Sequence, residues 1–109
     1  MAAFYLRTTQ MDKRQLRAIG HQLKPVVMVA GNGLSNSVME EIDRALNDHE
    51  LIKIKLSVND REERKQLANE ICETCSAEKV QEIGKVLLVL RKNSKPNPKT
   101  SNLIRYLSK

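Results

Sequence analysis

The feature that most constrains this chain is a strand–loop–helix–strand pattern over residues 24–56. Residues 26–29 form a short apolar run with β-branched members, which is typical of a strand buried on both faces. Residues 30–33, Ala-Gly-Asn-Gly, are a turn signal. Residues 51–58 alternate between apolar and polar side chains, as in a strand with one buried face. Strand–helix–strand units join parallel strands through right-handed crossovers, so the pattern predicts an α/β sheet.

Three helices are predicted from apolar stripes and caps. Within residues 11–23, apolar side chains recur at spacings of three and four. A capping box over residues 37–40, Ser-Val-Met-Glu, would begin the second helix. Asn59-Asp60 would turn the chain and cap a third helix that ends near Cys75. The inward side chains of these helices are expected to be Leu16, Ile19 and Leu23; Val38, Ile42, Ala45, Leu46 and His49; and Leu67, Ala68, Ile71 and Cys75.

Two more strands, residues 79–83 and 86–90, are joined by a tight turn at Gly84-Lys85. The predicted order is therefore α-β-α-β-α-β-β, a single compact α/β domain with a mixed four-stranded sheet and helices packed on it. The carboxyl ends of the first three strands should share one edge of the sheet, where α/β proteins favour ligands. Lys13 and Arg14 would also lie near that edge if the first helix runs antiparallel to the strand that follows it.

A chain of 109 residues allows one domain and a tail. Residues 1–10 show no clear period and are predicted to fray, residues 11–92 to form the domain, and residues 93–109 to be a basic flexible tail. Four apolar residues near the end would either dock on the domain as a last helical turn or stay loose: Leu103, Ile104, Tyr106 and Leu107. No membrane span or secretory signal is predicted, so a cytoplasmic protein is expected.

Charge is distributed unevenly along the chain. Residues 1–39 carry five basic and one acidic side chain, residues 40–82 seven and twelve, and residues 83–109 seven and none. Basic ends would orient a partner of dense negative charge, although a solvated surface with a loose basic tail would give the same pattern. The three aromatic residues lie in the terminal segments, so base recognition by aromatic stacking is not expected.

Catalytic and metal chemistry find little support in the sequence. Cys72 and Cys75 form a C-x-x-C at the carboxyl end of a predicted helix beside two glutamates, where a thiolate is disfavoured. A zinc site would need two more ligands, and neither His21 nor His49 has the spacing. The cysteines are therefore interpreted as structural, one buried and one half-buried. We expect no enzyme activity, no cofactor, no metal and no small-molecule substrate.

Several short motifs together resemble the CRS1–YhbY family, also called the CRM domain, and its small stand-alone bacterial members most of all. They are L-K-P-V-V (23–27), G-N-G-L (31–34), H-E-L-I-K-I-K-L (49–56), the Asp60-Arg61 turn and the Ile83-Gly84 turn. The resemblance implies a fold similar to the carboxyl-terminal domain of translation initiation factor 3. It also implies RNA binding, in association with precursors of the large ribosomal subunit.

The family's RNA surface is thought to use a G-x-x-G loop and nearby basic residues, in a manner similar to KH domains. Here Ala30 stands at the first glycine position, a departure that costs energy if that position needs a positive φ. The candidate RNA contacts are Ala30, Gly31, Asn32, Gly33, Lys13, Arg14, Arg17, Lys24, Arg61 and Lys85, with Lys53 and Lys55 behind them. The stems of those last two lysines would equally serve to cover apolar surface.

The sequence thus predicts a monomeric RNA-binding protein of large-subunit assembly, which contacts mainly phosphates. Because it lacks aromatic side chains in the domain, it should favour structured RNA and shape over sequence. One rival is a protein-interaction module whose acidic middle docks a basic ribosomal protein or assembly factor. A second rival is a thiol-redox protein.

Overall fold

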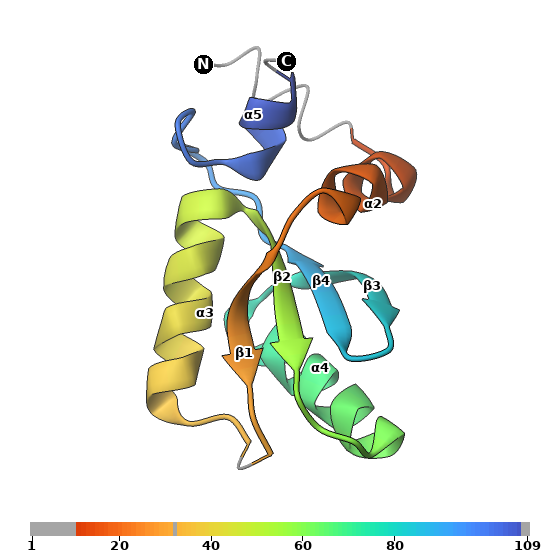
Figure 1. Ribbon diagram of the computed structural model, residues 1–109. Helices are drawn as coiled ribbons and strands as arrows, with labels where there is room; N and C mark the ends of the chain where they lie inside the picture. Colours follow the sequence, from red (N-terminus) through yellow and green to blue (C-terminus); the bar gives the residue numbers. More distant parts are fainter. Residues whose placement is uncertain (1–10, 32, 108–109) are drawn as a thin grey trace.

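The computed structural model describes residues 11–31 and 33–107 (Figure 1). Residues 1–10, for which fraying was predicted, lie outside this part of the chain. The elements alternate as predicted and end in an additional short helix. Their bounds are α2 Lys13–His21, β1 Pro25–Val29, α3 Asn36–His49, β2 Leu51–Leu56, α4 Arg61–Cys75, β3 Glu78–Ile83, β4 Val86–Leu90 and α5 Asn102–Leu107.

The four strands form one mixed sheet in the order β1-β2-β4-β3. β1 and β2 are parallel, whereas β4 runs antiparallel to both β2 and β3. β1, β2 and β3 therefore point the same way, and their carboxyl ends lie at one edge of the sheet, at the bottom of Figure 1. The predicted α/β class and mixed sheet are confirmed.

Helices α3 and α4 cover one face of the sheet and enclose the larger core. Ile52, Ile54 and Leu56 of β2 point into it, as their alternation predicts. They pack on the stripe of α3 that contains Ile42 and Leu46, both fully buried. The inward side chains predicted for α4 are confirmed: Leu67, Ala68, Ile71 and Cys75.

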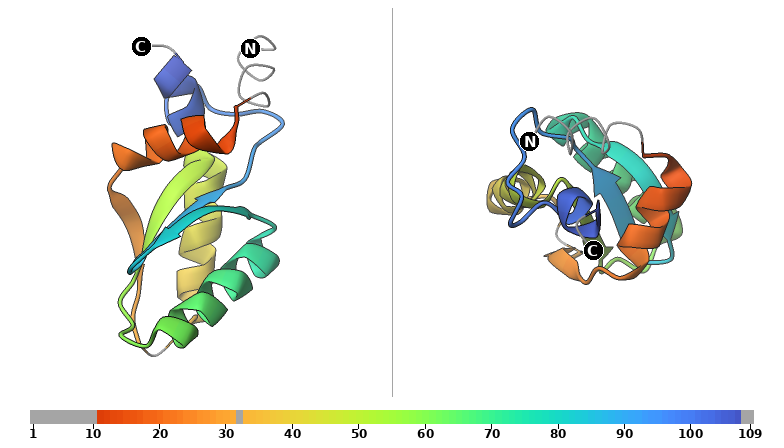
Figure 2. Two further views of the ribbon diagram at one scale, coloured as in Figure 1. Left: turned by 90° about the vertical axis from the view of Figure 1, so that its right-hand side faces the viewer. Right: turned by 90° about the horizontal axis from the view of Figure 1, so that it is seen from above.

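The other face is covered only at the end away from the loops, by α2 and α5 (Figure 2). Leu16 and Ile19 of α2 share a second core with Leu88 of β4 and Leu103 of α5. Gly20 allows α2 to lie close to the sheet, because a Cβ there would be 2.5 Å from a methyl group of Leu88. Among the helices that the structure describes, none lies over the half of this face nearer the loops (Figures 1 and 2).

This half-covered face corrects one expectation. β1 is not buried on both faces, since Val26 and Met28 are 45% and 61% exposed while Val27 and Val29 are buried. The apolar run predicted burial on both faces, but β1 lies at the edge of the sheet, and Val26 and Met28 point to the face that α2 and α5 cover only in part. The expected cap of α3 was also wrong: Ser35, not Ser37, accepts the hydrogen bond from the amide of Val38.

The segment after β4 packs against the domain, where a flexible basic tail was expected. Asn93 and Ser101 donate hydrogen bonds to the two carboxylate oxygens of Glu50, which is 1% exposed. Thr100 donates to the carbonyl of Asp48. Leu103 of α5 is fully buried, so the docked alternative for the last helix is the one that the structure adopts.

Within residues 11–31 and 33–107, no helix is long and apolar enough to cross a bilayer.

Candidate nucleic-acid interface

Three loops meet where the parallel strands end, and we call this region the loop edge: residues 30–33, 57–60 and 84–85. The amide of Ser57 donates to the carbonyl of Val29 at 2.8 Å, which joins the ends of β1 and β2. The amide of Leu56 donates to the carbonyl of Lys85 at 2.7 Å. The ammonium of Lys85 then donates to the side chain of Asn59 at 2.9 Å. The shared edge predicted from topology is therefore confirmed.

The glycine loop tolerates its alanine. Among the described residues, positive φ angles at glycine occur at Gly33, φ +88°, and Gly84, φ +56°, and Ala30 has no positive φ. Alanine at the first loop position therefore costs no backbone strain. A Cβ added to Gly31 would have no atom within 4 Å, so Gly31 leaves open space above the loop. The predicted contact Asn32 lies outside the described residues.

The amides of the loop are only partly free to bind an anion. That of Gly33 donates to the carbonyl of Ala30 at 3.1 Å, and that of Val38 donates to the Ser35 cap. Within the described residues, the amide of Gly31 makes no hydrogen bond. The amides of Glu62 and Glu63 at the start of α4 donate to Asp60. Side-chain cations therefore supply most of the positive charge at this edge.

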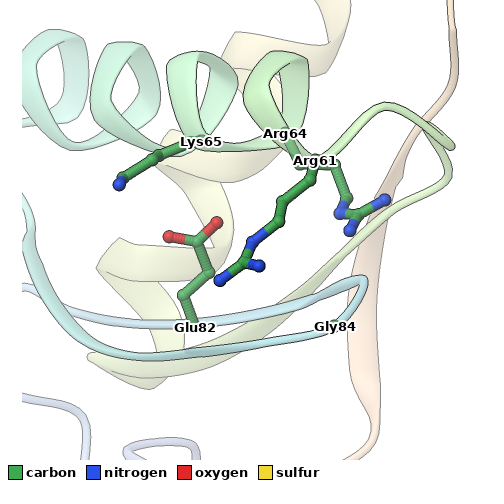
Figure 3. Close-up of a pocket in the computed structure, with 5 residues that line it drawn as sticks. All are labelled: Arg61, Arg64, Lys65, Glu82 and Gly84. Atoms are coloured by element: carbon green, nitrogen blue, oxygen red, sulfur yellow. The ribbon is translucent and has the colours of Figure 1, made fainter.

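A cleft of about 360 Å³ separates the first turns of α4 from the β3–β4 hairpin (Figure 3). It is lined by Arg61, Arg64, Lys65, Glu82 and Gly84. Figure 3 shows the side chains of Arg61 and Glu82 entering the space from opposite walls, with Lys65 to one side and Arg64 turned toward the other, where the turn before α4 holds it. Three cations thus surround a hollow that holds one carboxylate.

The cations of this cleft are differently held. Arg64 donates through one Nη1 to the carbonyls of Val58 and Asn59, at 2.7 and 2.8 Å, which fixes its guanidinium against the turn. Within the described residues, Arg61 and Lys65 make no hydrogen bond or ion pair. Glu82 is paired with Lys79 at 3.4 Å. The two unpaired cations are therefore available to phosphate oxygens.

The cations of α2 lie elsewhere. Lys13, Arg14 and Arg17 are exposed, but α2 crosses the sheet at the end opposite the loop edge instead of running antiparallel to β1 (Figures 1 and 2). Its apolar stripe packs on Leu51, Leu88 and Leu90, and this packing sets its direction. The expectation that Lys13 and Arg14 lie near the loop edge was conditional on an antiparallel helix, and it was wrong.

The remaining predicted cations lie on or beside the incompletely covered face of the sheet. Lys55 is exposed, and Lys53, two residues earlier on β2, is partly buried. Lys24 precedes β1 and lines a shallow hollow with Lys53 and Arg105. Lys24, Lys53 and Lys55 lie neither at the loop edge nor on the outer surface of α2. The predicted RNA contacts therefore fall on three surfaces: the loop edge, α2 and the incompletely covered face of the sheet.

Arg64 and Lys65 were missed in the sequence. They follow Arg61 by three and four residues, a spacing that places all three on one side of a helix. In R-E-E-R-K the two acidic residues stand between the basic ones, and such mixed charge is typical of a solvated helix face. The periodicity of the basic residues alone would have identified the cluster.

The cysteines have the environment expected of structural residues. Cys75 is buried and Cys72 half-buried. Burial raises the pKa of both thiols above the usual value, although Lys79 and Arg91 respectively act against the shift. Within the described residues, no three His, Cys, Asp or Glu side chains are grouped to hold a metal ion. A raised pKa disfavours the thiolate that redox chemistry requires.

Comparison with known proteins points to one family. The profile of the CRS1 / YhbY (CRM) domain matches residues 9–91. A probable RNA-binding protein of Pseudomonas aeruginosa is 52% identical over 98 residues, which cover 90% of this chain and 94% of that protein. An RNA-binding protein of Haemophilus influenzae is 45% identical over 80 residues, 73% of this chain and 81% of that protein.

A solved structure supports the same assignment. The solution structure of a hypothetical protein from Staphylococcus aureus matches with a TM-score of 0.70 and 29% identity, covering 82% of this chain and 92% of that one. The family profile covers most of the described elements, from α2 to the end of β4. The chain therefore belongs to the CRS1/YhbY (CRM) domain family.

Proposed function

We propose that this protein is a cytoplasmic, monomeric RNA-binding protein that associates with precursors of the large ribosomal subunit and acts in their assembly. The observation that carries the RNA contact is the convergence of Arg61, Arg64, Lys65 and Lys85 at the loop edge, around the cleft between α4 and the β3–β4 hairpin. Cations around a hollow at the ends of parallel strands suit a phosphate backbone. The names of the bacterial relatives, and the resemblance of the motifs, support the same class of ligand.

In this proposal the unpaired side chains of Arg61 and Lys65 bind phosphates, while Arg64 holds the turn and lines the cleft. The free amide of Gly31 seats one phosphate oxygen, and Lys24 and the cations of α2 contact more distant parts of the RNA. Each such contact releases counterions, so affinity should fall steeply with salt. The protein is not expected to be an enzyme.

A filter-binding titration against ribosomal RNA tests the loop edge. Arg61→Glu with Lys65→Glu should weaken binding more than tenfold and lower the slope of log affinity against log salt by about two. The α2 pair, Arg14→Glu with Arg17→Glu, should weaken it severalfold. Lys95→Glu with Lys99→Glu is the matched control, because both are exposed lysines outside these surfaces and the change in net charge is identical. An edge variant that binds no worse than this control would refute the proposed surface.

The ribosomal part of the proposal is tested by sedimentation of a lysate through a sucrose gradient. The protein should migrate with particles lighter than the mature large subunit and should leave them after nuclease treatment. Protein that remains at the top of the gradient at low salt would contradict association with a subunit precursor.

The acidic residues of the middle segment favour a second candidate function. They are exposed on α3 and α4, the two helices that cover the face of the sheet with the larger core. These residues are Glu40, Glu41, Asp43, Asp48, Glu62, Glu63, Glu70 and Glu73. Such a surface would suit a basic ribosomal protein or assembly factor. Association that survives nuclease but not high salt would identify this protein contact.

A further inference from the structure

Exposed apolar side chains gather on the half of the sheet that none of the described helices covers. Among the described residues, the large hydrophobic side chains that are exposed are Val26, Met28 and Ile83, at 45%, 61% and 64%. Val26 and Met28 alternate with residues that point toward α3 and α4, so they lie on the opposite face. Leu87 points into the larger core under α3 and α4, whereas Leu88 points into the second core. Val86 therefore lies on the same face as Leu88, and Ile83, which pairs with Val86, lies there too.

The strand register arranges these residues in a row across all four strands. Met28 pairs with Lys55, Lys55 with Val86, and Val86 with Ile83. With strands about 4.8 Å apart, the row is roughly 14 Å long. We call it the open-sheet row. It lies directly before the loop edge, since Val29 and Lys85 are the next residues of β1 and the hairpin.

A hollow of about 290 Å³ lies beside the row, toward α2. It is lined by His21, Lys53, Gln81, Ile83, Val86 and Leu88. The row and this lining carry Lys55 and Lys53 and no carboxylate. The surface therefore presents aliphatic groups beside two lysines, and it fits a ligand that is anionic and has flat apolar faces.

We propose that the open-sheet row binds unpaired bases of the RNA strand whose phosphates occupy the loop edge. The inference rests on the proposed function and adds a contact to bases, which the scarcity of aromatic residues had argued against. Met28, Val86 and Ile83 would contact base faces, and Lys55 would bind the phosphate between them. Unpaired nucleotides occur in loops and bulges of structured RNA, so base contacts of this kind are compatible with recognition of shape.

The test compares three probes: a mixed-sequence single-stranded RNA oligonucleotide, a fully paired RNA duplex, and heparin, a polyanion without bases. The variant Met28→Thr with Ile83→Thr removes apolar surface without changing charge, and both sites are exposed enough for the fold to be kept. Thr74→Ser, which trims an exposed side chain of α4, is the control. Circular dichroism melts of all three proteins establish that they are folded.

We expect the double variant to bind the single-stranded RNA about fivefold more weakly, with unchanged affinity for heparin and the duplex and an unchanged salt slope. If the double variant binds the oligonucleotide as tightly as the wild type does, the base contact is overturned and the loop edge is unaffected. Equal losses for RNA and heparin would overturn it too, because the change would then be electrostatic. If the variant instead loses self-association in sedimentation equilibrium while keeping its RNA affinity, the row is a dimer surface. A wild type that binds no RNA would refute the proposed function itself.

Discussion

The buried contact between Glu50 and Ser101 makes a strong prediction about stability. Ser101 is fully buried, and its hydroxyl donates to Oε1 of Glu50 at 2.6 Å while accepting from the amide of Ile104 at 3.3 Å. The other oxygen of Glu50 accepts from the amide of Asn93 at 2.7 Å. Ser101→Ala removes both hydrogen bonds of the hydroxyl, and the buried carboxylate of Glu50 then keeps only the hydrogen bond from the amide of Asn93.

The magnitude follows from these contacts. A hydrogen bond to a charged group contributes about 1.5–3 kcal/mol, and loss of a helix N-cap costs about 0.5–2 kcal/mol. The cap bond is long and α5 spans six residues, so the low end applies to it. Ser101→Ala should therefore lower the free energy of unfolding by about 2–4 kcal/mol. That is a large part of the roughly 5–15 kcal/mol that stabilises a typical domain.

Urea denaturation followed by circular dichroism measures this loss. With a slope of about 2 kcal/mol per molar urea, the midpoint should fall by about 1–2 M. Ser94→Ala is the matched control, because Ser94 is exposed and makes no hydrogen bond within the described residues. Glu50→Gln keeps an acceptor for Asn93 and should cost less than Ser101→Ala. A Ser101→Ala midpoint equal to that of the control would show that the segment after β4 is not fixed, and would refute the reasoning.

Three further predictions concern the glycines and the cysteines. Gly33→Ala should destabilise by about 1 kcal/mol because φ is +88° there, whereas Gly31→Ala, which meets no atom, should change the melting temperature little. Gly20→Val should destabilise by about 1–3 kcal/mol in urea titrations, since its side chain would overlap Leu88. Burial raises the pKa of Cys72 and Cys75, so at neutral pH the native protein should react with iodoacetamide more slowly than the unfolded protein does. The stability that these neutral thiols contribute is present below the ordinary thiol pKa and should be lost as pH rises through their raised values.

Local periodicity was sufficient to predict the order of the elements up to β4 and the class of the fold. The alternation in β2 and the stripe in α4 are set by residues close in sequence, and topology alone placed the ends of three strands at one edge. The direction of α2 depends on where Leu16 and Ile19 meet residues some 70 positions away, and no local pattern encodes it. The segment after Arg91 was interpreted as flexible because it is polar, yet its polar groups bind Glu50 and Asn47.

The site was predicted in the same uneven way. The loop edge followed from strand direction, and Arg61 and Lys85 are placed on it. Arg64 and Lys65 were missed because the charges of their helix were considered as a whole and not by periodicity. The open-sheet row was hidden by the prediction that residues 26–29 are buried on both faces, although Met28 and Val26 are exposed on an edge strand.

The placement of the cations also constrains the RNA. The loop edge and the outer surface of α2 lie toward opposite ends of a domain whose longest dimension is 42 Å (Figure 1). A short single strand bound at the loop edge would not contact Arg14 or Arg17, whereas a helix or a folded junction would reach both. If both surfaces contribute, affinity should depend on the size of the RNA more than on its sequence, which is the behaviour expected of a protein that recognises folded RNA by shape.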